Sequence, residues 1–209
     1  MRLRVLAAAG VAVLLAACSD RNDLPTTPRG GSAHRTVTPT GSLDQNITIL
    51  LSFFPKGLQT AGSARWTDVK RKYAAGQLDV AKKMLFELAQ WVKDKAPDMD
   101  APPNDETKSA AAARLTLYMS MYVFGSPSTP VPVYTPSADA TVGLVTPDQP
   151  ATIVTPLQRA GVGMEAGTVA EASILVITEN PTPYPDACSG QLQTKLCQYP
   201  RFYDFTIFP

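Results

Sequence analysis

Cysteine and histidine, two residue types common in nucleophilic and metal sites, are scarce in this sequence. The chain contains three cysteines, Cys18, Cys188 and Cys197, and one histidine, His34. A Ser/His/Asp or Cys/His catalytic device needs a histidine that the fold holds in place. His34 instead lies among Thr, Pro, Gly and Ser residues, a composition typical of a solvated segment. The sequence therefore predicts no catalytic residue, and the cysteines favour structural roles.

Cys18 stands at the end of an apolar run near the N-terminus. Arg2 and Arg4 precede the apolar residues 5–17, which is the layout of an export signal. The run is shorter than the roughly 20 residues that cross a bilayer. Its closing letters, LAAC, resemble the bacterial lipobox, which implies cleavage between Ala17 and Cys18 and a diacylglycerol on the cysteine sulfur. The alternative is an ordinary secretory signal with an incidental cysteine.

The lipobox resemblance implies that the mature chain begins at Cys18 and stays on a membrane, because two or more acyl chains hold a protein stably on a bilayer. Ser19 and Asp20 follow. By resemblance to Gram-negative lipoproteins, a serine directly after the cysteine indicates the outer membrane. We therefore expect a cell-envelope location, with the membrane as a partner through the N-terminal lipid and with the membrane face left open.

Cys188 and Cys197 are a candidate disulfide. An exported chain meets an oxidising compartment, where such pairs form and persist. The closed loop is short, and its chain entropy corresponds to roughly 2.5 to 3 kcal/mol of stabilisation. Two cysteines without a nearby histidine cannot complete a four-ligand zinc site. Two free thiols are the alternative, and no metal or other cofactor is expected.

Charge is distributed unevenly along the chain. Residues 43–126 carry 11 Lys or Arg against 9 Asp or Glu, whereas residues 127–209 carry 3 against 7. This shift indicates a domain boundary near Gly125. The formal net charge is only +1. No basic run is interleaved with aromatic residues, so nucleic acid is not an expected partner.

Composition and periodicity divide the chain into five expected segments. These are a lipoprotein signal peptide over 1–17, a disordered tether over 18–42, a helical domain over 43–125, a proline-rich connector over 126–140 and a β-sandwich over 141–209. The tether has almost no large apolar side chains and cannot offset the entropy of ordering. As a flexible coil it reaches roughly 25 to 30 Å.

Apolar periodicity predicts a three-helix unit in the helical domain. Pro55 suits the first turn of one helix, which Gly76 ends, and the next helix stops at Pro97. Because the link between these two helices is short, they are expected to form an antiparallel hairpin. A third helix, apolar on most faces and ended by Gly125, is expected to fill the groove of that hairpin.

Two groups of side chains in the helical domain have a structural and a functional interpretation. The first group consists of aromatic and methionine side chains at helical spacing, expected to form core rather than a ligand box: Trp66, Trp91, Tyr118, Met119 and Tyr122. The second group consists of carboxylates between helices, expected to form a solvated linker rather than a Ca²⁺ site: Asp98, Asp100, Asp105 and Glu106.

The C-terminal part changes to short segments rich in Val, Ile, Thr, Tyr and Phe. The segments are TVGLV, ATIVT, ASILVITE and RFYDFTIF, and turn residues separate them. No helical pattern lies between them, so a parallel βαβ sheet is not expected. The predicted fold class is α+β, a three-helix unit followed by an antiparallel β-sandwich, complete or incomplete.

Two stretches resemble ZU5-type β-sandwiches. AGVGMEAGTVAEASILVITE (160–179) resembles their core, a short strand, a Gly-containing turn and an Ile/Val-rich strand, and YPRFYDFTIFP (199–209) resembles their later aromatic strand. The resemblance implies further strands beyond Pro209, a truncated chain and a last strand with an uncovered edge. Some ZU5 proteins cleave themselves at a His-Phe-Ser triplet, which this sequence lacks.

The helical hairpin resembles small helical repeats beside Ig-like modules on bacterial surface proteins, which implies attachment or spacing. Together the patterns favour a lipid-anchored cell-envelope protein with a non-catalytic binding, adhesive or structural role and a protein or glycan partner. The alternative is an envelope-polymer hydrolase, or the N-terminal part of one, that works through a pair of carboxylates.

Overall fold

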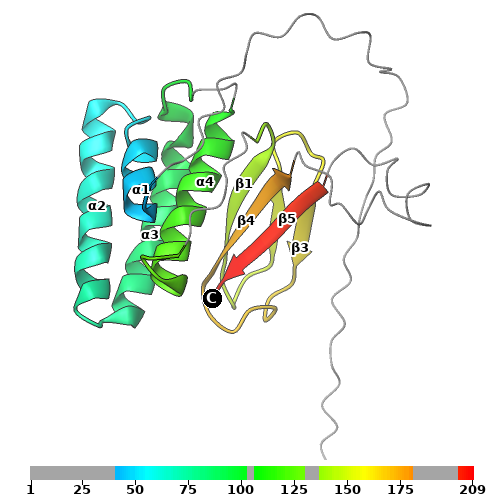
Figure 1. Ribbon diagram of the computed structural model, residues 1–209. Helices are drawn as coiled ribbons and strands as arrows, with labels where there is room; N and C mark the ends of the chain where they lie inside the picture. The colour runs from blue at the N-terminus through cyan, green and yellow to red at the C-terminus, as the bar shows by residue number, and fades with distance from the viewer. Residues whose placement is uncertain (1–40, 103–105, 130–136, 181–201) are drawn as a thin grey trace, which may run out of the picture.

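The computed structural model describes residues 41–102, 106–129, 137–180 and 202–209 (Figure 1). Within these ranges helices are followed by antiparallel strands, which confirms the α+β class. The α-helices are α1 (Leu43–Leu51), α2 (Lys56–Ala74), α3 (Leu78–Lys95) and α4 (Lys108–Ser120), with a 3₁₀ turn η1 (Ala96–Asp98) and a π-helical turn η2 (Met121–Gly125). The strands are β1 (Ala140–Val145), β2 (Ala151–Val154), β3 (Gly161–Met164), β4 (Ser173–Asn180) and β5 (Phe202–Phe208).

Helix α1 is one helix more than the three that the sequence predicted. Ser42 and Gln45 form a reciprocal capping box at its start, with hydrogen bonds of 3.3 and 3.1 Å. A helix of nine residues is marginal alone, so it depends on burying its apolar side chains against the other helices. These side chains are Leu43, Ile47, Leu50 and Leu51.

Helices α2 and α3 form the predicted antiparallel hairpin. Gly76 ends α2 in the left-handed conformation, with φ of +71°, which a glycine adopts without steric cost. The amides of Gly76 and Gln77 donate to the carbonyls of Tyr73 and Lys72, the hydrogen-bond pair of a Schellman cap. The chain therefore reverses tightly between the two helices.

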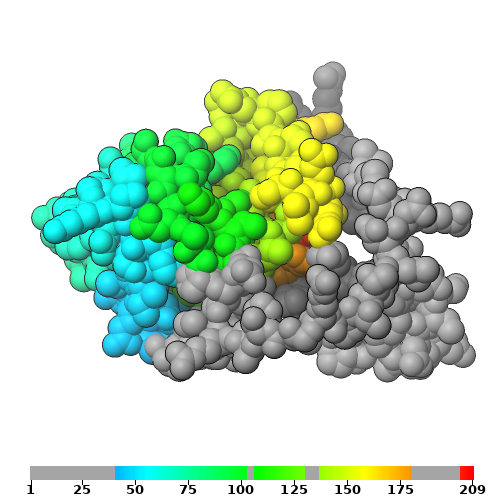
Figure 2. Space-filling view, turned by 90° about the horizontal axis from the view of Figure 1, so that it is seen from above, coloured from blue at the N-terminus to red at the C-terminus, as the bar shows by residue number. Residues whose placement is uncertain are grey.

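Helix α4 lies at the centre of the molecule and is buried on nearly all sides. It packs against α1 and α3 on one side and against β1 and β4 on the other. The run Ala110–Ala113 is buried, and its small side chains let neighbouring elements approach closely. Figure 2 shows the green helical residues directly against the yellow-green and yellow residues of the strand region. The helices and the sheet therefore share one core, to which the strands contribute Ala140, Val142, Ile174 and Val176.

The strands form a three-stranded antiparallel sheet of order β1-β4-β5 and a separate hairpin of β2 and β3. Side chains alternate between the faces of β4. Ile174 and Val176 join the helical core, whereas Leu175 and Ile177 join a second core with Ile153 of β2. The hairpin therefore packs on the face of the sheet that points away from the helices.

At Gly143 the β2–β3 hairpin packs directly against the backbone of β1 through the side chain of Ile153. A Cβ atom at this position would collide with the side chain of Ile153. The exact β-sandwich that the sequence predicted is not confirmed, because α4 covers the face of the sheet that a free-standing sandwich would expose to water. None of the helices in the described ranges has the length and apolar content that spanning a membrane requires.

Candidate interaction surface

The predicted site residues at both ends of the chain lie outside the described residues. This holds for the signal cleavage site at Ala17 and Cys18, for His34 and for the cysteine pair Cys188 and Cys197. The lipidation at Cys18 and the disulfide therefore stay predictions. Residues 18–40 of the tether and residues 130–136 of the proline-rich connector lie outside the described residues as well.

The aromatic and methionine side chains of the helical domain are core, as the sequence predicted. Trp66, Tyr118 and Met119 are buried, and Trp91 and Tyr122 are partly buried against the same core. The rings of Trp66 and Tyr122 meet edge to face, with centroids 5.1 Å apart. These side chains fill space between helices and leave no ligand box.

The carboxylates between α3 and α4 do not act as one solvated group, which corrects the prediction for Glu106. Its side chain is 1 % exposed, and it accepts a 2.8 Å hydrogen bond from Arg114 of α4. Asp98 and Asp100 are exposed, and Asp105 lies outside the described residues. Among the residues that the structure describes, no three His, Cys, Asp or Glu side chains are placed to hold a metal ion.

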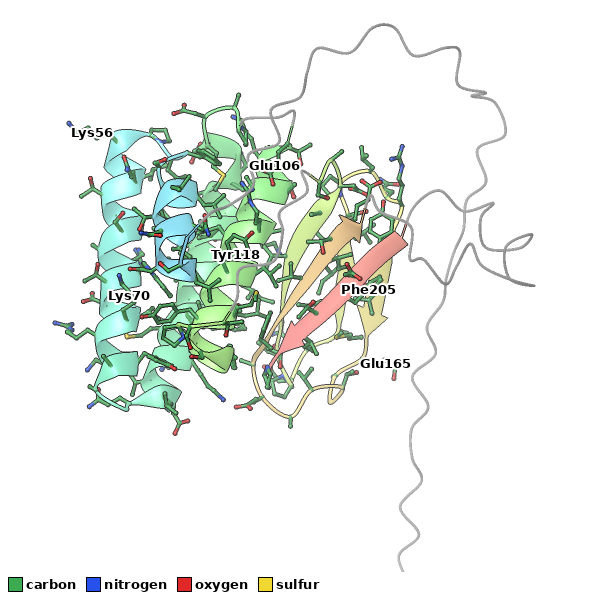
Figure 3. The ribbon with its side chains drawn as sticks, viewed as in Figure 1. Lys56, Lys70, Glu106, Tyr118, Glu165 and Phe205 are labelled. Carbon is green, nitrogen blue, oxygen red and sulfur yellow. The ribbon has the colours of Figure 1, made fainter. Side chains whose placement is uncertain are left out.

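The buried pair has an electrostatic neighbour in Tyr118, one turn further along α4. Burial raises the pKa of Tyr118 to about 12, and the positive charge of Arg114 opposes this rise. The phenol is therefore held neutral in the core that the helices and the sheet share. Figure 3 labels Glu106 and Tyr118 in the helical part of the molecule. The arrangement stabilises the junction and offers no open site for a substrate.

Strand β5 carries the clearest candidate surface. It forms one end of the three-stranded sheet and, within the described residues, pairs with β4 alone. Phe205 and Ile207 lie on the face away from the helices, opposite Ile177 and Leu175 of β4, and each is 47 % exposed (Figure 3). We call Phe205 and Ile207 the β5 patch. An apolar patch on an edge strand is typical of a binding site for an extended chain.

Asp139 and Tyr203 hold the β5 patch in position. Asp139 is fully buried just before β1 and accepts hydrogen bonds from the Leu157 amide at 2.9 Å and from the Tyr203 hydroxyl at 2.8 Å. Its own carbonyl accepts from the amide of Glu179 at 3.0 Å. Burial, followed by the bond to Asp139, raises the pKa of Tyr203. One buried carboxylate thus ties β5, the end of β4 and the β2–β3 loop to the start of β1.

A second feature of the surface is a shallow hollow between α2 and α3. It encloses about 130 Å³ and is lined by Arg65, Asp68, Met84, Glu87 and Leu88. Asp68 also forms a 2.9 Å ion pair with Arg71. The hollow therefore brings two carboxylates to one place, which matters for the hydrolase alternative.

Sequence reasoning predicted the β5 patch in part and missed the residues that position it. The segment RFYDFTIF was predicted to be an apolar strand, and β5 is an outer strand of the sheet within the described residues. The burial of Asp139 could not be predicted, because an aspartate before a strand is common in solvated turns. The burial of Glu106 could not be predicted either, since its partner Arg114 lies in a helix that was predicted to be apolar on most faces.

Comparisons with known proteins do not extend these observations. No protein-family model matches the chain, and neither the comparison with curated proteins nor that with solved structures finds a match.

Proposed function

We propose that this chain is a lipid-anchored cell-envelope protein that binds a partner and carries out no catalysis itself. The observation that carries the proposal is the sequence LAAC ending at Cys18, placed after two arginines and an apolar run. The β5 patch supports the binding role, because exposed apolar side chains on an edge strand suit an added strand from another protein. The partner chemistry is therefore an extended, apolar peptide segment.

The anchor is tested by changing Cys18→Ala and fractionating the cells. The unchanged chain sediments with membranes and carries acyl groups on its N-terminal residue, whereas the variant is released in a folded state. Mass spectrometry of the N-terminus and circular dichroism of the released protein check both points. A Cys18→Ala chain that still sediments with membranes would contradict the anchor.

The binding role is tested at Phe205. The chain is captured from detergent-solubilised envelope as wild type, as Phe205→Asp and as Leu157→Asp, a control that places the same charge at a residue 49 % exposed outside the sheet. We expect one protein to be captured by wild type and by Leu157→Asp and to be lost with Phe205→Asp. Equal capture by all three chains would exclude the β5 patch as the binding site.

A hydrolase acting on envelope polymers is the second candidate, and the hollow between α2 and α3 is the observation that favours it. Asp68 and Glu87 both line this hollow. Glu87 is exposed and Asp68 is ion-paired with Arg71, whereas glycosidases enclose one acid in apolar surroundings. Release of soluble sugar from envelope polymer that both Asp68→Asn and Glu87→Gln abolish would establish this function.

A further inference from the structure

We propose that the tip of the α2–α3 hairpin is a second membrane contact, which binds anionic lipid headgroups. The hairpin tip is defined here as residues Lys70–Lys83, the end of α2, the turn at Gly76 and the start of α3. This inference rests on the proposed lipid anchor, because the anchor brings the tip within reach of a bilayer. It adds a defined surface through which the folded part faces that bilayer.

The hairpin tip is the most cationic end of the helical domain. It holds one carboxylate, Asp79, and five cations: Lys70, Arg71, Lys72, Lys82 and Lys83. Asp44 pairs with Lys70 and Asp68 pairs with Arg71, so two positive charges remain in excess. Within the residues that the structure describes, Lys72 and Lys83 form no ion pair.

The opposite end of the same two helices provides an internal comparison. With the residues next to the helix ends included, there are four lysines against three aspartates: Lys56, Lys93, Lys95, Lys108, Asp94, Asp98 and Asp100. Figure 3 shows Lys56 and Lys70 towards opposite ends of α2. The excess of positive charge is therefore larger at the tip than at the opposite end of the hairpin.

Two apolar side chains are exposed among the cations of the tip. Leu78 is 49 % exposed and Val80 is 44 % exposed, both in the first turn of α3. Exposed apolar residues flanked by lysines are typical of surfaces that lie in the interface of an anionic membrane. The acyl-chain boundary beneath anionic headgroups would bury these two apolar side chains, which an electrostatic contact with phosphate or carboxylate groups alone does not do.

The place where the N-terminal segment joins the fold is a further observation that bears on the hairpin tip. Residues 1–40 lead into α1, and Asp44 in its first turn contacts two residues of α2. It accepts hydrogen bonds from Trp66 at 2.8 Å and from Lys70 at 2.9 Å. Lys70 is four residues, or about 6 Å along the helix axis, from the end of α2. The start of α1 therefore lies beside the second half of α2, the half that leads to the hairpin tip.

The test places a tryptophan at the tip and asks whether lipid reaches it. The chain is purified from membranes as Val80→Trp and reconstituted in vesicles of phosphatidylglycerol with brominated phosphatidylcholine, which quenches tryptophan on contact. Ile49→Trp is the matched control, since Ile49 is 52 % exposed and lies on α1. The unchanged chain gives the background from Trp66 and Trp91.

We expect quenching at residue 80 and none at residue 49. Vesicles of brominated phosphatidylcholine alone should leave residue 80 unquenched, as should about 1 M salt, where the Debye length is about 3 Å. Adding Lys72→Glu and Lys83→Glu should remove the quenching, since each cation near an anionic surface accounts for roughly a fivefold change in binding. Lys56→Glu with Lys93→Glu is the charge-matched control and should preserve it.

Absence of quenching at residue 80 in the anionic vesicles would overturn the proposal, and so would equal quenching at residue 49. Failure of the anchor is recognised separately. If Cys18→Ala still sediments with membranes, the lipid anchor is wrong whatever the probe reports. If sedimentation depends on Cys18 but Val80→Trp is not quenched, only the role of the hairpin tip is wrong.

Discussion

The hydroxyl of Tyr203 donates a 2.8 Å hydrogen bond to Oδ2 of Asp139, joining residues that are 64 positions apart in the sequence. Tyr203 lies on β5 and Asp139 precedes β1, and β4 lies between these two strands in the sheet. The bond therefore crosses the central strand and links the two outer ones. It fixes the position of β5, where the exposed Phe205 and Ile207 provide little packing energy of their own.

Removing this hydroxyl tests the link. Tyr203→Phe leaves the ring in place but takes one donor from the fully buried Asp139, so we expect unfolding to become easier by about 1 to 3 kcal/mol. Urea unfolding measures the change. The control is Tyr73→Phe, because the hydroxyl of Tyr73 makes no hydrogen bond in the described part of the chain. A loss of the same size in both variants would contradict the role of the bond.

Gly143 should not tolerate a larger side chain. Gly143→Ala places a Cβ against Ile153, which displaces the β2–β3 hairpin from the sheet. We expect the free energy of unfolding to fall by about 1 to 3 kcal/mol. In a chain that already carries Ile153→Ala, the same change should cost less, because the colliding atoms are gone. Thermal unfolding of the four chains gives this coupling. Gly163→Ala, where the new Cβ would have nothing within 4 Å, is the matched control.

The ion pair of Glu106 and Arg114 should matter far more than a surface pair. Glu106→Gln removes the negative charge 2.8 Å from Arg114, which is 11 % exposed, and we expect the free energy of unfolding to fall by about 3 kcal/mol or more. Asp68→Asn breaks the exposed pair with Arg71 and should lower the free energy of unfolding by about 1 kcal/mol or less. Chemical unfolding of the two variants measures both losses. Equal losses would mean that the burial of Glu106 has no energetic consequence.

Alkaline pH should weaken the fold through Tyr118. The pKa of this phenol is about 12 in the folded chain, above the usual value of 10.0. Above pH 10 the unfolded chain loses this proton while the folded chain keeps it, so the stability contribution is complete below pH 10 and is lost towards pH 12. Urea unfolding at a series of pH values should show a smaller alkaline decline in Tyr118→Phe than in wild type. An identical decline would contradict the shift.

The predicted disulfide would lie within the connection between two paired strands. Asn180 ends β4 opposite Phe202, which begins β5, and Cys188 and Cys197 fall between them in the sequence. Cys188→Ser should lower the melting temperature under non-reducing conditions, corresponding to roughly 2.5 to 3 kcal/mol. Cys197→Ser should act equally, and the double variant should add nothing. No change in melting temperature would mean that the thiols are unpaired.

The parts of the fold that the sequence predicted are those set by local periodicity. The stripe of α3 and the end of α2 at Gly76 follow from residues close together in the chain. The short β segments were likewise identifiable from their β-branched and aromatic residues. In each case neighbouring residues carry the signal, so one sequence was sufficient.

The parts that the sequence did not predict depend on partners far along the chain. Helix α1 is stable through burial against other helices, which its own short pattern does not reveal. The hydrogen bond from Tyr203 to Asp139 likewise could not be predicted from the residues next to either of them in the sequence. The packing of α4 between the other helices and the sheet was indicated only indirectly. Its apolar surface is broader than a helix needs when only one of its sides is covered. This is why the helices and strands were expected as separate units.

The shared packing of α4 has a consequence for the order of events when the chain is synthesised. A polypeptide emerges N-terminus first, so Ala110 to Ala113 appear well before the residues of β1 and β4 that cover them. Until those strands are synthesised, the apolar side of α4 that packs against β1 and β4 is exposed to water or bound by a chaperone. The core that α4 shares with β1 and β4 is therefore complete only after β4 has been synthesised.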